Sequence, residues 1–105
     1  MRTAAQKTSG TGLSLKDVLR LPANAPARVI DGEMILVDIH VREVLHFNPT
    51  ATWFVQQLDG KRTLAAVLRR ILNRFKVDAA SAQADLLELM ESLFRQGVLE
   101  RIEKP

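Results

Sequence analysis

Residues 45–60, LHFNPTATWFVQQLDG, contain the change from strand to helix around which the rest of the chain can be placed. Leu45 and Phe47 alternate with a histidine, a pattern that is typical of a half-buried strand. Asn48 followed by Pro49 predicts a helix start, because an asparagine oxygen can accept from the free N–H groups of the first turn and proline has no N–H there to leave unpaired. We therefore expect sheet before this point and helices after it.

The helix that begins here carries one apolar stripe. Its members recur at i, i+3, i+4 and i+7: Ala51, Phe54, Val55 and Leu58. Asp59 and Gly60 end the helix, since glycine accepts the left-handed conformation found at helix ends. Trp53 points about 200° away from Ala51. It is predicted either to pack on another element of this chain or to contact the N-terminal arm, a second subunit or a partner.

Length and composition predict one small domain. The chain has 105 residues, 47% of them hydrophobic, and no cysteine, which excludes disulfides and thiolate sites. No apolar run approaches the roughly 20 residues of a membrane span, and no apolar segment follows the first charges as in a secretory signal. We expect a cytoplasmic protein that does not bind membranes.

The net charge of +3 comes from the ends of the chain. Residues 1–26 carry four basic residues against one acid, and Lys104 adds one more positive charge, whereas residues 27–103 contain ten basic and eleven acidic residues. The folded part is close to neutral, which weakens a prediction of nucleic-acid binding based on charge alone.

The first 26 residues are predicted to form a flexible arm and linker. Residues 1–12 are small and polar and are expected to be disordered. Residues 13–21, LSLKDVLRL, are favoured as a flexible arm. The alternative is a docking segment, with a short helix begun at Ser14, that fits the domain's own groove or a partner. PANAP at residues 22–26 breaks any helix, so the domain itself is expected over residues 27–103.

Residues 27–47 are predicted to form a small antiparallel sheet. Strands are expected at residues 28–31, 34–39 and 44–47, with a turn at Asp31 and Gly32. The middle strand is apolar at successive positions, which predicts that both faces of the sheet are covered. The outer edge of the third strand is expected to be free and could pair with another strand.

Two further helices follow. Thr63 is predicted to cap one and Asp78 the next, which ends near Gly97. The last helix carries apolar residues over an arc of about 160°, wider than a single core contact requires. A short strand or irregular tail follows at residues 98–102. The order of elements predicts an α+β fold of winged-helix character, with a three-stranded antiparallel sheet followed by a three-helix bundle.

Catalytic and metal-binding patterns are missing from the sequence. His40 and His46 have no acidic or cysteine partner at ligand spacing, and the five glycines are scattered rather than grouped as in a phosphate loop. We predict no catalytic residue, no metal site, no cofactor and no enzymatic activity.

Three features are candidates for binding, of which Trp53 is described above. The edge of residues 44–47 lies next to the apolar arc of the last helix, where Leu87, Met90 and Phe94 are either core or pockets for an added strand. The second helix has a basic side, which is either solvated or a docking patch for an acidic protein: Arg62, Arg69, Arg70, Arg74 and Lys76. The acids of the last helix oppose DNA binding through it, since DNA binding depends on neutralising phosphates.

Several short stretches together resemble the PQQ-synthesis protein D family, small domains also called RiPP recognition elements. They are FNPTA at 47–51, LDGKRTL at 58–64, FKVD at 75–78 and DLL at 85–87 before GVL at 97–99. The similarity covers about residues 27–100. One departure is that the aromatic often found within the family's first helix would fall at Val55, whereas here Trp53 and Phe54 come just before it.

The resemblance implies a peptide-binding adaptor. Such proteins bind the leader of a ribosomally made precursor peptide as an added strand and present it to a modifying enzyme, frequently a radical S-adenosylmethionine protein. Carried over to this chain, the implied peptide-binding residues are Val44, Leu45, His46, Phe47, Leu87, Met90, Glu91 and Phe94. Trp53, Arg69, Arg70 and Arg74 are the predicted contacts for the modifying enzyme.

Two other functions remain open from the sequence. One is a winged-helix transcriptional regulator that binds DNA through the arginines of the second helix. The other is a self-associating scaffold, a homodimer in which residues 13–21 of one chain fill the groove of another.

Overall fold

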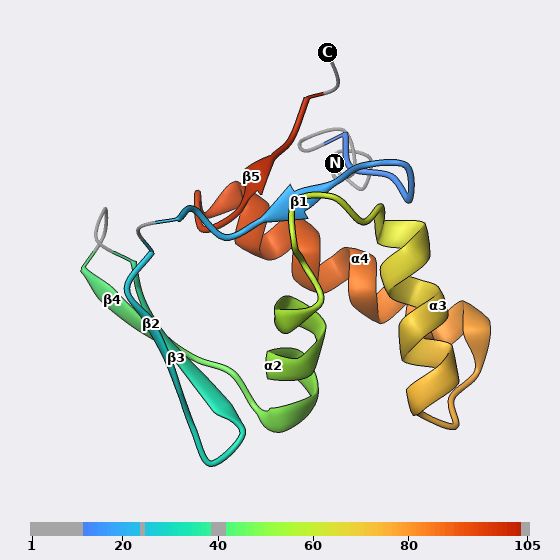
Figure 1. Ribbon diagram of the computed structural model, residues 1–105, viewed down its shortest axis with the longest axis horizontal. Helices are drawn as coiled ribbons and strands as arrows, with labels where there is room; N and C mark the ends of the chain where they lie inside the picture. Colours follow the sequence, from blue (N-terminus) through green and yellow to red (C-terminus); the bar gives the residue numbers. More distant parts are fainter. Residues whose placement is uncertain (1–11, 24, 39–41, 104–105) are drawn as a thin grey trace, which may run out of the picture.

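Three antiparallel strands are followed by three helices, with a second, two-stranded sheet formed by the two ends of the chain (Figure 1). The computed structural model describes residues 12–23, 25–38 and 42–103. The strands are β1 (Leu19–Arg20), β2 (Ala27–Ile30), β3 (Glu33–Asp38), β4 (Glu43–His46) and β5 (Glu100–Arg101). The helices are α2 (Pro49–Gln56), α3 (Leu64–Arg74) and α4 (Ala79–Arg95). The predicted α+β class is confirmed.

The larger sheet has the order β2-β3-β4. Asp31 and Gly32 connect β2 to β3 with φ angles of 53° and 80°, the left-handed values that a two-residue hairpin requires and that an Asp-Gly pair accepts readily. The register aligns Ile30 with Glu33 across this turn. The predicted hairpin is therefore confirmed, although Ile39, at the end of the predicted second strand, lies outside the described residues.

Each helix begins at the residue that the sequence predicts. Asn48, Thr63 and Asp78 accept hydrogen bonds from the backbone N–H groups of Ala51, Ala66 and Ser81. Pro49 occupies the first position of α2, where its missing N–H costs nothing. The caps fix where the three helices start. The apolar stripes of the helices then fix which side of each faces the core.

A buried threonine joins the sheet to α2. The hydroxyl of Thr52 accepts from the N–H of Met34 at 2.8 Å and lies 3.3 Å from the carbonyl oxygen of Phe47, to which it donates. Thr52 is only 2% exposed, so these hydrogen bonds satisfy groups that water cannot reach. The side chain therefore replaces one ladder hydrogen bond where β4 turns into α2.

The N-terminal segment is part of the fold, so the predicted domain boundary at residue 26 is wrong. β1 pairs with β5 in an antiparallel ladder, and Leu19 is 0% exposed within the main core. The carbonyls of Leu15 and Asp17 accept from the N–H groups of Ala65 and Leu64 at 2.9 Å, at the start of α3. Docking on the domain's own core is thus confirmed for residues 13–21, in place of the favoured flexible arm and without the predicted helix.

The disorder expected for residues 1–12 concerns, apart from Gly12, residues outside the described part of the chain. Leu19 is buried in the chain's own core, and Leu13, Leu15 and Leu21 pack against that core. The homodimer formed through this arm stays a prediction.

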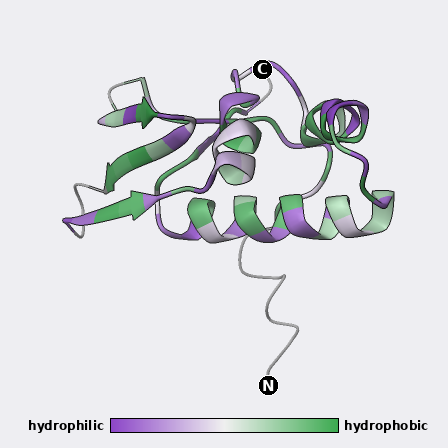
Figure 2. Ribbon diagram, turned by 90° about the horizontal axis from the view of Figure 1, so that it is seen from below, coloured by the Kyte–Doolittle hydropathy of each residue, from purple (hydrophilic) through white to green (hydrophobic). Residues whose placement is uncertain are grey.

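The outer face of the larger sheet is open, which corrects the prediction that both of its faces are covered. Met34 and Leu36 alternate with Ile35 and Val37 along β3, and only the first pair is buried. On the outer face Ile30 is 51% exposed, Val37 39% and Val44 64%. The helices cover one face only, because all three lie on the same side of the sheet (Figure 2).

The core sits between that inner face and the helices. Leu64, Val67 and Ile71 of α3 and Leu86 and Met90 of α4 are all 1% exposed or less. Among the described residues, no helix is both long and apolar enough to cross a membrane.

Candidate functional site

The outer edge of β4 is the one predicted site feature that the backbone defines directly. β4 pairs only with β3, and no other strand of the described residues lies along its second edge. The short C-terminal strand β5, which could have closed this edge, pairs with β1 instead. An unpaired edge of this kind is a template for an incoming strand.

The register shows which backbone groups face outward. The N–H of Phe47 donates to the carbonyl of Met34 at 2.9 Å, and hydrogen-bonded pairs then recur at every second residue of an antiparallel ladder. Leu45 therefore exchanges hydrogen bonds with Leu36. The N–H and C=O groups of Val44 and His46 point away from β3. Of the four predicted strand residues, these two can pair with a guest strand through their backbone.

The side chains of β4 alternate between two environments. Val44 and His46 lie on the outer face, where His46 Nε2 is 2.7 Å from Glu33 Oε1. Leu45 is half-buried on the inner face, and Phe47 is 8% exposed in the core. A guest residue opposite Leu45 would consequently point toward the helices, and guest residues opposite Val44 and His46 would join the outer face.

Helix α4 contributes less to this edge than predicted. Met90 is 0% exposed, so it is a core residue and cannot receive a side chain from outside. The guanidinium carbon of Arg101, in β5, lies 5.5 Å from the ring centroid of Phe94. Phe94 therefore faces β5.

Leu87 and Glu91 share the flank of α4 that carries Phe94, because positions three and seven residues apart lie on one side of a helix. In Figure 1, β1 and β5 lie above the C-terminal end of α4, whereas the larger sheet lies below and to the left of that end. Phe94 thus contacts β5, and the assignment of Leu87, Glu91 and Phe94 to peptide binding stays a prediction.

The opposite flank of α4 lies on the side of the helix away from β5. Ser92 and Gln96 lie about 200° around the helix from Phe94, and Leu89 about 140°. Leu89 and Ser92 are half-buried, and Gln96 Nε2 donates to Ser92 Oγ at 3.1 Å. Sequence reasoning did not single out these residues, because the periodicity of α4 defines its core side and does not distinguish its two flanks. Identifying the flank required the position of β5.

The second predicted site, around Trp53, is assembled at the corner between α2 and α3. The Trp53 ring packs edge-on against Phe75, with centroids 5.3 Å apart, and against Phe54 at 6.4 Å. Packing within the chain is thus confirmed for Trp53. Its half-exposed ring also borders a hollow of about 360 Å³ lined by Trp53, Arg70, Asn73 and Arg74, which we call the Trp53 corner.

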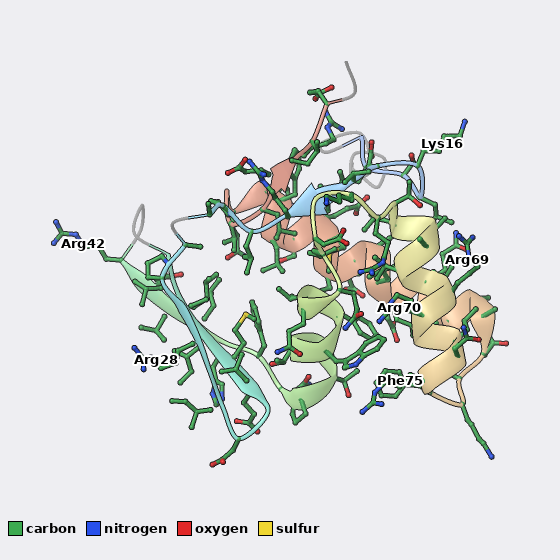
Figure 3. All side chains as sticks on the ribbon, in the orientation of Figure 1. Lys16, Arg28, Arg42, Arg69, Arg70 and Phe75 are labelled. Atoms are coloured by element: carbon green, nitrogen blue, oxygen red, sulfur yellow. The ribbon has the colours of Figure 1, made fainter. Side chains whose placement is uncertain are left out.

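Arg69 does not belong to the Trp53 corner. Figure 3 shows the Arg69 and Arg70 side chains leaving α3 in different directions, because successive residues of a helix are about 100° apart. The predicted set of partner-docking residues therefore divides into Trp53, Arg70 and Arg74 at one place and Arg69 at another.

The turn between α2 and α3 is held by Asp59. Its Oδ1 accepts from the N–H groups of Lys61 and Arg62 at 2.9 and 2.8 Å, and these hydrogen bonds lower the pKa of Asp59 below its usual value. Within the described part of the chain, no group of three or more His, Cys, Asp or Glu side chains could hold a metal ion.

The fold and the open edge place this chain in a class of small α+β domains with a sheet of three strands followed by three helices. Comparison with known proteins gives the family. The profile of the family described as "Coenzyme PQQ synthesis protein D (PqqD)" matches residues 33–99. The chain belongs to the PqqD family.

Curated relatives carry the name "PqqA binding protein". Two of them, from Xanthomonas euvesicatoria pv. vesicatoria (strain 85-10) and Xanthomonas axonopodis pv. citri (strain 306), are 32% identical over 56 residues. The match covers 53% of this chain and spans 61% of the length of either relative.

A solved structure described as "TbiB1 in Complex with the TbiA(beta) Leader Peptide" has a similar fold. Its TM-score with this chain is 0.69 at 16% identity, and the match covers 77% of this chain and 94% of the other. At this identity the likeness concerns the fold.

Proposed function

We propose that this chain binds the leader segment of a ribosomally made precursor peptide as an additional strand on β4 and presents it to a modifying enzyme. The observation that carries the proposal is the unpaired edge of β4, with the backbone groups of Val44 and His46 directed outward. The names of the Xanthomonas relatives and the leader peptide bound to the structural neighbour support it.

The edge offers enough backbone for a short strand. Val44 and His46 supply two N–H donors and two C=O acceptors, and each hydrogen bond contributes about 1 kcal/mol net. A micromolar complex requires about 8 kcal/mol, so side-chain burial must supply much of the remainder. The guest residue opposite Leu45 is placed for this, since it points toward the helices on the inner side of the sheet.

The leader is thus expected to have a definite pattern. An apolar residue opposite Leu45 should be flanked on both sides by residues that join the outer face, where Val44 is 64% exposed. A β-branched residue opposite Val44 would fit that position best, because cross-strand apolar pairs stabilise neighbouring strands. Selectivity in this proposal comes from alternating side chains on two faces.

In this proposed function the chain itself catalyses no chemical step. DNA binding has less support than peptide binding. α4 exposes Asp85 and Glu88, and acids on the helix that would enter a groove oppose phosphates. The family resemblance implies a radical S-adenosylmethionine protein as the modifying enzyme, and we propose such an enzyme as the second partner.

Titration with the precursor peptide encoded beside this gene tests the proposed function. We expect saturable changes in the amide signals of Val44 and His46 in NMR spectra, with a dissociation constant near micromolar. A peptide of the same composition in scrambled order is the control and should leave these signals in place. Saturable binding that leaves Val44 and His46 unchanged would contradict strand addition at β4.

A further inference from the structure

A second surface lies away from β4, at the Trp53 corner. In Figure 3, Arg70 and Phe75 lie along the side of α3 that faces α2, whereas β4 lies at the far end of the molecule. What this corner could bind follows from two features of its two arginines. One is how each side chain is held, and the other is that neither has an acidic partner among the described residues.

Arg74 is fixed by aromatic rings. Its guanidinium carbon lies 5.6 Å from the ring centroid of Trp53 and 5.7 Å from that of Phe75. Cation–π contacts of this kind hold the guanidinium without using its N–H groups. Among the described residues, none accepts a hydrogen bond from Arg74.

Arg70 is fixed by a buried amide. Its Nε donates to Gln57 Oε1 at 2.8 Å, and Gln57, 8% exposed, is itself held because its Nε2 donates to the Trp53 carbonyl at 3.0 Å. With Nε engaged, the two terminal nitrogens of Arg70 have no partner in the described part of the chain. The two arginines therefore present free N–H donors at one hollow before any ligand arrives.

Neither charge is compensated. The ion pairs of the described residues involve Arg20, His46, Arg62 and Arg101, and none includes Arg70 or Arg74. A planar guanidinium with free terminal nitrogens matches a carboxylate, which can accept two parallel hydrogen bonds. Trp53 and Asn73 border the hollow in which such a pair would lie.

We infer that the Trp53 corner binds carboxylate side chains of an acidic segment on a protein partner, separately from the peptide bound at β4. A protein is favoured over nucleic acid because, among the described residues, the cations that line this hollow are Arg70 and Arg74. Arg69 leaves α3 in a different direction, and duplex binding depends on neutralising many phosphates along an extended surface. Gln57 acts as a positioning residue through its hydrogen bond to Arg70.

The test is an NMR titration of the full chain at low salt with end-capped hexaglutamate, with hexalysine as the control. We expect saturable shifts of the Trp53 indole N–H and of the Arg70 and Arg74 Nε–H signals, with hexalysine inactive. In the double variant Arg70→Gln/Arg74→Gln binding should weaken at least tenfold, and in Arg69→Gln less than twofold. Equal weakening in the two variants, or no saturation in the unchanged chain, would overturn the inference.

Two further titrations distinguish an acidic protein partner at the Trp53 corner from nucleic acid binding there and from a site shared with the precursor peptide. A 12-base-pair duplex should bind more weakly than hexaglutamate, and tighter binding of the duplex at the same signals would overturn the assignment to a protein partner. The precursor peptide should bind Arg70→Gln/Arg74→Gln with unchanged affinity. Loss of that binding would show one shared site and contradict two separate surfaces.

Discussion

β1 and β4 are both short strands at an edge, yet the fold treats them differently. β1 is paired with β5, and its Leu19 is 0% exposed. β4 is paired on one side only, and its Val44 is 64% exposed. The C-terminal strand covers the edge of β1 and leaves that of β4 open. The comparison indicates that β1 stabilises the domain, whereas β4 is available for binding.

The largest expected effect is on the β1 side of the comparison. Leu19→Ala should lower the free energy of unfolding by about 3 kcal/mol, because it leaves a cavity in a fully buried site. Val44→Ala should lower it by less than about 0.5 kcal/mol, since Val44 is mostly exposed. Urea unfolding measures both values. Similar losses in the two variants would contradict the contrast between the strands.

Removing the Thr52 hydroxyl tests the junction between β4 and α2. Thr52→Val should cost about 2 kcal/mol, because the buried Met34 N–H and Phe47 carbonyl lose the group that joins them. Thr52→Ser retains the hydroxyl and is the matched control for the hydrogen bonds. If both variants unfold at the same urea concentration, the hydroxyl contributes nothing to the junction.

Proline at Val44 sharpens the distinction between the two edges of β4. Val44→Pro removes an N–H that faces outward and should weaken precursor-peptide binding about tenfold, or ~1.4 kcal/mol, with little loss of stability. Leu45→Pro removes a hydrogen bond to Leu36 and should destabilise the sheet itself. Val44→Thr keeps the N–H and should bind normally. Calorimetric titration and thermal unfolding give both quantities, and unaltered affinity in Val44→Pro would count against strand pairing there.

The smallest effect is expected at Asp59, which belongs to neither strand. Hydrogen bonds from Lys61 and Arg62 lower the pKa of Asp59 in the folded state. The ionised side chain therefore stabilises the fold above the unfolded-state pKa of about 4, and this contribution is lost as the pH falls through the lower folded-state pKa. Relative to Asp59→Asn, the extra stability of the unchanged chain should be present at pH 6 and absent near pH 2. Peptide affinity at pH 7 should be the same in both. A stability difference that grows toward low pH would contradict this account.

The elements of the fold could be predicted where the signal is local. Asn48, Thr63 and Asp78 are capping residues next to apolar stripes, and Asp31-Gly32 is a turn sequence, so the helix starts and the hairpin follow from neighbouring residues. The pairing of β1 with β5 could not be predicted, because it joins residues about 80 positions apart and each strand is only two residues long.

The site shows the same division between local and distant information. The free edge of β4 followed from the order of the strands, but the flank of α4 that contacts β5 did not. An apolar arc of about 160° on α4 includes both flanks, and only the contact between Phe94 and Arg101 assigns one of them to β5. Likewise, Arg69 and Arg70 are adjacent in sequence, yet only Arg70 lies at the Trp53 corner.

Hydrogen exchange of the β4 amides tests the central claim most directly. Without peptide, the Val44 and His46 amides should exchange rapidly and the Leu45 amide slowly, because only Leu45 donates to β3. At saturation with the precursor peptide, the Val44 and His46 amides should become at least tenfold slower, with Leu45 little changed. Saturated peptide that leaves Val44 and His46 exchanging as fast as before would contradict an added strand on β4.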